Sequence, residues 1–183
     1  MTELEMLAHE IGVNERTLRR AVNQGTLRAA RPTPRALRLP VGERRYLQRS
    51  WPLLSALRGA LRTEQNVRFA LLFGSAARGT DTPASDIDVM VDLRDPSLDR
   101  VMDLSTKLSA ATGRRVDVIR TEDAEAEPVL FADVVTDGRV LADRESLWPR
   151  LRRRESSLRL RGDQQEADRT RAAFAGIDRL LAA

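Results

Sequence analysis

The chain has 183 residues, a formal net charge of +4 and no cysteine, which excludes disulfides and thiolate metal sites. No apolar run approaches the roughly 18–20 residues that cross a bilayer, and no signal-peptide pattern is present. We therefore expect a cytoplasmic protein with no membrane partner. Residues 1–65 hold 12 arginines and 6 acids, residues 66–143 hold 9 basic and 15 acidic residues, and residues 144–183 hold 10 arginines and 6 acids. A basic block of domain size at the N-terminus is typical of proteins that bind a polyanion.

The first 25 residues predict two short helices. Apolar residues recur at helical spacing within residues 3–10, and Gly12 follows where a tight turn between helices is needed. Asn14 has the character of an N-cap for a second helix, which reaches Gln24 and stops at Gly25.

Strand patterns at residues 27–31 and 36–39 then flank a turn at residues 32–34. Two helices followed by such a hairpin resemble a winged helix-turn-helix of the MerR or excisionase type. The resemblance implies that the second helix enters the major groove, while arginines of the hairpin reach the DNA backbone or the minor groove. The residues implied in DNA contact are Arg16, Thr17, Arg20, Asn23, Gln24, Arg31, Arg35 and Arg38. The alternative is a small helical adaptor whose arginines are simply solvated.

Residues 41–61 have a helical pattern rich in leucine, and Pro52 is expected to open a new helical segment within them. We interpret this stretch as a linker that packs against both flanking domains. Trp51 is expected in the core, because it falls on the apolar stripe of the helix; stacking on a base is the alternative role.

The most informative pattern begins with an apolar strand at residues 67–73, which runs into Gly74 and Ser75. A short helix over 75–78 and a polar loop follow, and a second strand then opens with Asp86-Ile87-Asp88. Residues two apart on a strand point the same way, so the two carboxylates share a face. They repel and raise each other's pKa unless a cation lies between them. Oxygen ligands of this kind suit Mg²⁺, and the Gly-Ser turn predicts a phosphate-binding backbone.

A third acid, Asp117, lies in a predicted strand whose valines at 116 and 118 point to the opposite face. Predicted helices precede and follow this strand, from Asp95-Pro96 to about Ala111 and from Pro128 to Thr136. Taken alone, an Asp-x-Asp pair is usually part of a solvated loop or strand end, and a Gly-Ser turn carries little information. Three acids on neighbouring strands together are typical of nucleotidyl transfer with two metals roughly 3.5–4 Å apart.

Residues 66–143 thus resemble a minimal nucleotidyltransferase domain of the DNA polymerase β-like superfamily. The matching features are Gly74-Ser75, a ten-residue spacer, Asp86-Ile87-Asp88, Asp117 and the closing stretch from Asp137 to Leu141. The resemblance implies that Asp86 and Asp88 bind two Mg²⁺ ions, and that Asp117 completes the second site and helps to deprotonate the incoming hydroxyl. It also implies that Gly74 and Ser75 hold the β- and γ-phosphates of ATP. Arg78 and Ser85 are further candidates for phosphate contact and loop anchoring.

Residues 144–183 predict a charged helical tail in two pieces that separate near Gly162, with an apolar stripe at Phe174, Ile177 and Leu181. The stripe could close onto its own domain, pair with a second copy in a homodimer or dock a partner. The predicted fold class is therefore α+β. The expected organisation is a winged helix-turn-helix (1–40), linker helices (41–65), a small mixed-sheet nucleotidyltransferase domain with flanking helices (66–143) and a helical tail (144–183).

Minimal nucleotidyltransferases resemble the antitoxin half of two-gene toxin–antitoxin modules, whose partner is a helical ribonuclease toxin. That resemblance implies transfer of AMP from Mg²⁺-ATP to a hydroxyl on a partner protein, with promoter binding by the N-terminal domain. Minimal members usually lack such a domain. Two alternatives stay open: a DNA-binding regulator with a nucleotide-sensing transferase domain, and nucleotidylation of a small molecule.

Overall fold

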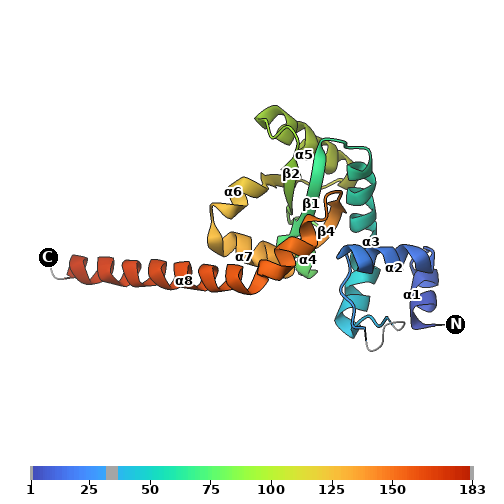
Figure 1. Ribbon diagram of the computed structural model, residues 1–183, viewed down its shortest axis with the longest axis horizontal. Coiled ribbons are helices and arrows are strands. Elements are labelled where there is room, and N and C mark those ends of the chain that lie inside the picture. Colours follow the sequence, from blue (N-terminus) through green and yellow to red (C-terminus); the bar gives the residue numbers. More distant parts are fainter. Residues whose placement is uncertain (1, 32–36, 182–183) are drawn as a thin grey trace.

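The computed structural model describes residues 2–31 and 37–181, with side chains up to residue 174. The fold is α+β, built on one mixed sheet of four strands in the order β3-β2-β1-β4 (Figure 1). The elements in chain order are α1 (Glu3–Glu10), α2 (Glu15–Gln24), α3 (Val41–Arg62), β1 (Val67–Phe73), α4 (Gly74–Arg78), β2 (Ile87–Leu93), α5 (Leu98–Thr112), β3 (Val116–Arg120), α6 (Thr121–Glu125), α7 (Pro128–Asp137), β4 (Arg139–Asp143) and α8 (Leu147–Leu181).

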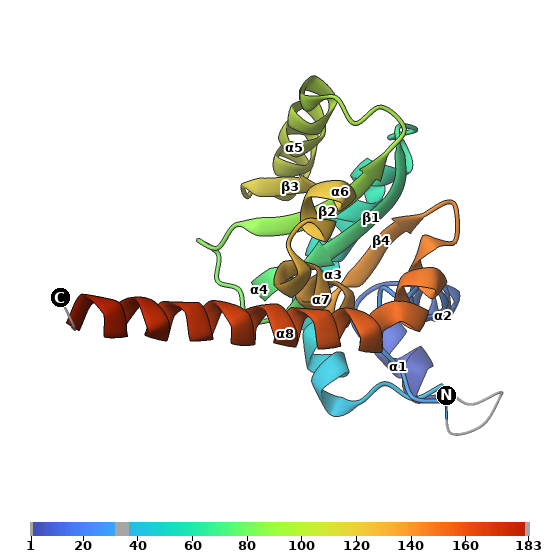
Figure 2. The same ribbon diagram turned by 60° about the vertical axis from the view of Figure 1, so that its left-hand side comes forward.

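The sheet separates two apolar cores, because alternate side chains of each strand point to opposite faces. β1 pairs antiparallel with both β2 and β4, whereas β2 pairs in parallel with β3. Ala70 and Leu72 of β1 pack with the core that contains α3 and α5, while Phe69 and Leu71 pack with α7 and α8 on the other face (Figure 2). Helices therefore cover both faces of the sheet.

The two N-terminal helices form as the sequence predicts. Asn14 caps α2 by accepting the N–H of Arg16 at 2.8 Å, and Gly25 ends the helix with a left-handed φ of 85°. Buried residues of α1 and α2, including Leu7 and Leu18, belong to the same apolar cluster as the sheet residues that face α3. The N-terminal helices therefore share a core with the sheet.

The strand predicted over residues 27–31 is wrong. Within the described residues, only an isolated bridge between Ala30 and Arg38 joins the two flanks of the predicted hairpin. The predicted turn at 32–34 and Arg35 lie outside the described residues. The preceding segment bonds to β4 instead: Val140 donates its N–H to the Gly25 carbonyl at 3.2 Å, and the Thr26 hydroxyl donates to the Val140 carbonyl at 2.6 Å.

A buried ion pair ties helix α3 to β4. Arg139 donates to both carboxylate oxygens of Glu43 at 2.5 and 3.0 Å, and both side chains are almost fully buried. The same guanidinium donates to the carbonyl of Ala77 at 2.6 Å and stacks 3.5 Å above the ring of Tyr46. Removing one member of such a buried pair typically costs about 3–5 kcal/mol, because the other charge is left uncompensated.

Two helix predictions differ from the structure, one because of packing and one because of a local hydrogen bond. Pro52 opens no new segment but lies inside the continuous helix α3, whose neighbouring residues Trp51 and Leu54 are both buried. Burial on both sides of the proline outweighs the one backbone hydrogen bond that it removes. Helix α5 starts at Leu98 rather than at the Asp95-Pro96 pair, because Asp95 accepts the N–H of Ser97 in a turn ahead of the helix.

The tail is one continuous helix, α8, and the predicted separation near Gly162 is wrong. Helix α8 approaches α7 closely at Gly162, where a Cβ would lie 3.0 Å from the Cβ of Ala132. Leu151 and Leu158 are buried on the same side, so the first half of α8 packs against its own domain. The second half extends past the rest of the molecule (Figures 1 and 2), and Phe174 is 64% exposed there. The side chains of Ile177 and Leu181 are not described.

None of the helices in the described part of the chain combines the length and the apolar character needed to span a membrane.

Candidate active site

Three acids lie at one end of the sheet. The parallel pairing of β2 with β3 places Asp88 directly opposite Asp117, and Asp86 lies one residue before β2. Ile87 and Val89, which alternate with the acids, are fully buried on the opposite face. Asp88 is half-buried, whereas Asp86 is exposed. The strand register therefore holds these carboxylates on one side of the sheet, as the sequence predicts.

Burial and the neighbouring acids affect the pKa of Asp88. Burial raises the pKa of Asp88, and the carboxylates of Asp117 and Asp86 raise it further, while nearby Arg78 lowers it in part. The exposed side chain of Arg115 partly compensates this negative charge, with its guanidinium 3.0 Å from Asp117 and 3.9 Å from Asp86. The end of the sheet thus presents more negative charge than its own cations balance.

Glycine is required at position 74 both by the backbone conformation and by the adjacent side chain of Asp88. Its φ is +67°, in the left-handed region that favours glycine, and a Cβ at this position would collide with Oδ2 of Asp88. The turn into α4 therefore fits directly against the carboxylate. No side chain caps α4 at Phe73, so the amides that begin this short helix, including that of Ser75, lack a side-chain cap among the described residues.

Arg78 and Ser85 have different environments. Arg78 is half exposed, forms a long ion pair of 3.4 Å with Asp137 and lies near enough to Asp88 to lower its pKa. The Ser85 hydroxyl accepts the N–H of Thr82 at 3.0 Å and thus stays within its own loop. Arg78 is positioned toward the acids, and Ser85 anchors the loop.

The donor set is compatible with a hard cation such as Mg²⁺. Within the described residues, no three His, Cys, Asp or Glu side chains come together as a ready-made metal site. Mg²⁺ typically binds through one or two carboxylates together with substrate phosphates, so a complete protein cage is not required. Burial and the neighbouring carboxylates raise the pKa of Asp88, and a cation beside it would stabilise its ionised form. Gly74 lets the backbone lie directly against that carboxylate.

Comparison with known proteins agrees with this geometry. Residues 56–147, just over half of the chain, match the family described as "Polymerase beta, Nucleotidyltransferase". The chain belongs to this family. It is therefore a nucleotidyltransferase. A protein adenylyltransferase MntA from Thermococcus cleftensis is 38% identical over 68 residues, which cover 37% of this chain and 69% of that protein.

Solved structures share the fold of this nucleotidyltransferase. A chain from a crystal structure of a toxin–antitoxin with AMP-PNP has a TM-score of 0.50 and 23% identity, and the match covers 70% of this chain and 98% of that chain. A chain from the complex of a tri-AMPylated Shewanella oneidensis HEPN toxin with an MNT antitoxin has a TM-score of 0.50 and 21% identity, with the same coverage. At these identities the likeness establishes the fold alone.

Five of the eight predicted DNA-contact residues lie on α2. All five helical candidates, Arg16, Thr17, Arg20, Asn23 and Gln24, are exposed. Asn23 accepts a hydrogen bond from Arg31 at 2.5 Å, and Gln24 accepts one from Arg58 at 2.5 Å. Exposed Arg38 lies 3.9 Å from Glu3. The two amide side chains that would read bases are therefore already engaged within the protein.

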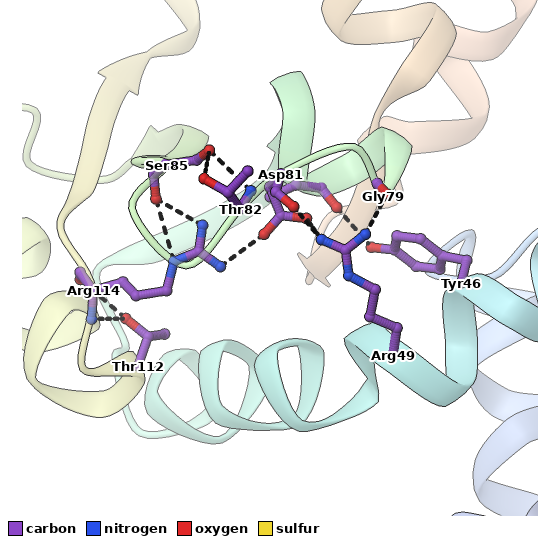
Figure 3. Close-up of polar contacts among 9 residues, drawn as sticks. Tyr46, Arg49, Gly79, Asp81, Thr82, Ser85, Thr112 and Arg114 are labelled. Atoms are coloured by element: carbon purple, nitrogen blue, oxygen red, sulfur yellow. Dashed lines mark hydrogen bonds and ion pairs between the residues drawn. The ribbon is translucent and has the colours of Figure 1, made fainter.

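A buried acid that the sequence analysis did not single out secures the spacer loop between Gly74-Ser75 and Asp86 (Figure 3). Asp81 is only 8% exposed and accepts a hydrogen bond from Arg114 at 2.7 Å on one carboxylate oxygen and from Arg49 at 3.1 Å on the other. Arg114 also donates twice to the Ser85 carbonyl, and Arg49 donates to the Gly79 carbonyl at 2.8 Å. The only available signal in the sequence was that Asp81 is the one acid in the ten-residue spacer.

Tyr46 supports the other end of the same loop from α3. Its hydroxyl donates to the carbonyl of Ala76 at 3.2 Å, and a Cβ on Gly79 would collide with its ring. Burial raises the pKa of Tyr46 to about 12, so the side chain stays a neutral donor. Both α4 and the spacer loop are thus positioned from α3.

We predict that Asp81→Asn loosens the spacer loop between Gly74-Ser75 and Asp86. The substitution removes the negative charge between Arg49 and Arg114 and places an amide donor against their guanidinium groups. Hydrogen exchange of amides in residues 79–86 should accelerate at least about tenfold, equivalent to 1.4 kcal/mol.

The matched control is Asp133→Asn, which changes an exposed acid of α7. It should leave amide hydrogen exchange in the spacer loop unchanged. Equal exchange in the Asp81→Asn protein and in the wild type would contradict a positioning role for Asp81.

Proposed function

We propose that this nucleotidyltransferase transfers AMP from Mg²⁺-ATP to a hydroxyl on a partner protein, as the antitoxin of a toxin–antitoxin pair. The observation that carries the proposal is the placement of Asp88 opposite Asp117, beside the Gly74 turn. That arrangement suits a triphosphate whose charge is balanced by cations. The family match supports nucleotidyl transfer, and the adenylyl group is favoured because a relative is a protein adenylyltransferase.

In this proposal Asp86 and Asp88 hold two Mg²⁺ ions, and Asp117 holds the second of them. When bound there, Mg²⁺ would supply positive charge against the triphosphate and would lower the pKa of the attacking hydroxyl. Backbone amides at Gly74 and Ser75 bind the β- and γ-phosphates, and Arg78 lies near enough to stabilise the negative charge that develops on them.

The transfer step forms a bond between the acceptor oxygen and the α-phosphorus and breaks the bond between the α-phosphorus and the bridging oxygen. Pyrophosphate leaves, and the hydroxyl proton passes to Asp117. Because Asp117 is half-buried and faces Asp88 across the parallel ladder, its carboxylate is held at a fixed place relative to the acids that bind the metals.

A protein acceptor is favoured over a small molecule by the size of the domain. The described residues consist of the sheet, its covering helices and the N-terminal helices, and the three acids occupy an exposed end of the sheet. A partner must therefore supply the surface that holds the hydroxyl near the α-phosphate. Toxin–antitoxin complexes among the structural relatives, one of them with an AMPylated HEPN toxin, support this choice.

The test is transfer of label from α-labelled ATP to the protein encoded by the neighbouring gene, in the presence of Mg²⁺. We predict that Asp88→Asn lowers the rate at least about 10²-fold, or 2.7 kcal/mol, because it removes a metal-binding carboxylate. Asp133→Asn, which changes an exposed acid on α7, should transfer at the wild-type rate. Undiminished transfer by the Asp88→Asn protein would refute the site, and wild-type enzyme that labels no protein would refute the acceptor class.

The N-terminal helices supply a second proposed activity, the binding of DNA by residues 1–40. Support comes from the basic balance of the N-terminal block and from the polar face of α2, on which Arg16 and Arg20 are exposed. The reading as a small adaptor is the alternative. Because this segment shares a core with the sheet, its binding is best measured in the full chain.

We predict that the full chain binds a duplex from upstream of its own gene with steep salt dependence, measured by fluorescence anisotropy. Arg16→Gln should reduce the salt slope by about one phosphate contact. Arg153→Gln, an equal charge change at an exposed position of α8, should not. Absence of binding at low salt would favour the adaptor, whereas DNA binding without any protein labelling would favour a nucleotide-sensing regulator.

A further inference from the structure

A concave surface lies between α2, α3 and β4, and neither proposed activity uses it as a whole. This basic groove has a volume of about 540 Å³, and the residues that define it here are Arg20, Arg58, Arg62, Arg144, Trp51 and Asp143. It runs along the end of β4 near Asp143, which pairs with Phe69, whereas Asp88 pairs with Phe73 at the opposite end of β1. The groove and the three acids therefore occupy different ends of the sheet.

The groove holds more positive charge than its own acid balances. Asp143 is its one lining acid, and its carboxylate accepts the backbone N–H groups of Leu147 and Trp148 at 2.9 and 3.0 Å, which begin α8. Arg144 is also engaged, since its guanidinium donates to backbone carbonyls at the end of α3, including that of Leu61 at 2.9 Å. Asp143 and Arg144 are thus engaged with the backbone, and Asp143 does not balance the positive charge of Arg20, Arg58 or Arg62.

Arg58 is the unusual member of this set. It is half-buried, and it donates to two neutral acceptors, Oγ1 of Thr26 at 3.1 Å and Oε1 of Gln24 at 2.5 Å. Burial lowers the pKa of Arg58, and the neighbouring charge of Arg20 lowers it further. Among the residues that the structure describes, no carboxylate pairs with Arg20, Arg58 or Arg62. A partly buried cation facing a second cation is stabilised when an anion enters between them.

The shape of the groove favours a small anion over a nucleic acid. Duplex DNA presents its phosphates on a convex surface, so it would contact exposed Arg20 and Arg62 more readily than half-buried Arg58. Trp51 and Leu141 add apolar surface beside the arginines, which suits a ligand that carries an organic group as well as phosphate. The volume of about 540 Å³ falls in the range of small-molecule sites.

We propose that the basic groove is a second ligand site, which binds the phosphate groups of a small molecule of nucleotide size through Arg20, Arg58 and Arg62. The proposal is independent of the transfer activity, because the groove lies at the other end of the sheet from the acids. An occupant would join Arg20 of α2 to Arg58 and Arg62 of α3, whereas in the protein alone Arg58 donates to the neutral side chains of Thr26 and Gln24.

The probe is pyrophosphate, titrated into the full chain by calorimetry at low salt with EDTA present. Without divalent metal the three acids repel a polyanion, so binding reports on the groove. We expect one saturable site, weakened at least tenfold by Arg62→Gln, by Arg20→Gln and by Arg58→Gln. Because Arg58→Gln also removes hydrogen bonds to Thr26 and Gln24, the exposed Arg20 and Arg62 positions keep the test decisive if that variant does not fold.

Arg153→Gln is the matched control, since it removes the same charge from an exposed site on α8 outside the groove, and it should bind as the wild type does. Absence of saturable binding, or equal affinity in all variants, would overturn the proposal. Duplex DNA that binds the wild type but not Arg62→Gln, when pyrophosphate does not bind, would assign the groove to nucleic acid and overturn the small-ligand site.

Discussion

The parallel pairing of β2 with β3 is the constraint on which the site depends. It places Asp88 opposite Asp117, an arrangement that two carboxylates would avoid if they were free to move apart. Burial of Ile87, Val89 and Val116 on the other face of the same strands offsets the repulsion. Folding thus creates a negative site whose charge is relieved by a cation, which is the electrostatic condition that nucleotidyl transfer requires.

A second set of contacts connects this site to the rest of the chain. Arg139 pairs with Glu43 of α3 and donates to the Ala77 carbonyl of α4, so one buried guanidinium links β4, α3 and the helix that follows Gly74. Tyr46 and Arg49, one turn apart on α3, hold α4 and the spacer loop. The N-terminal helices pack into the same core. Helix α3 is therefore a common support for the site and for the N-terminal helices.

The sequence predicts the parts that depend on local pattern. Alternation in the strands identified the faces of Asp88 and Asp117, and the glycine that follows the apolar strand at residues 67–73 located the turn. What it could not show are contacts between residues far apart: Asp81 lies 32 residues from Arg49 and 33 from Arg114. Local rules also misjudged Pro52 and Gly162, because packing against the sheet and α7 overrides the usual tendency of proline and glycine to end helices.

The central claim is that the carboxylates form a cation-dependent nucleotide site, and thermal unfolding at neutral pH tests it directly. Because the folded protein raises the pKa of Asp88, ionisation of this group lowers stability as pH rises above its unfolded-state pKa. Asp88→Asn should therefore raise Tm in EDTA. At a nucleotide concentration of 100 times Kd, Mg²⁺ with a non-hydrolysable ATP analogue should stabilise the wild type by about 2.7 kcal/mol and so raise its Tm. The Tm of the variant should stay unchanged. Equal stabilisation of both proteins by the nucleotide, or a lower Tm of the variant in EDTA, would contradict the account.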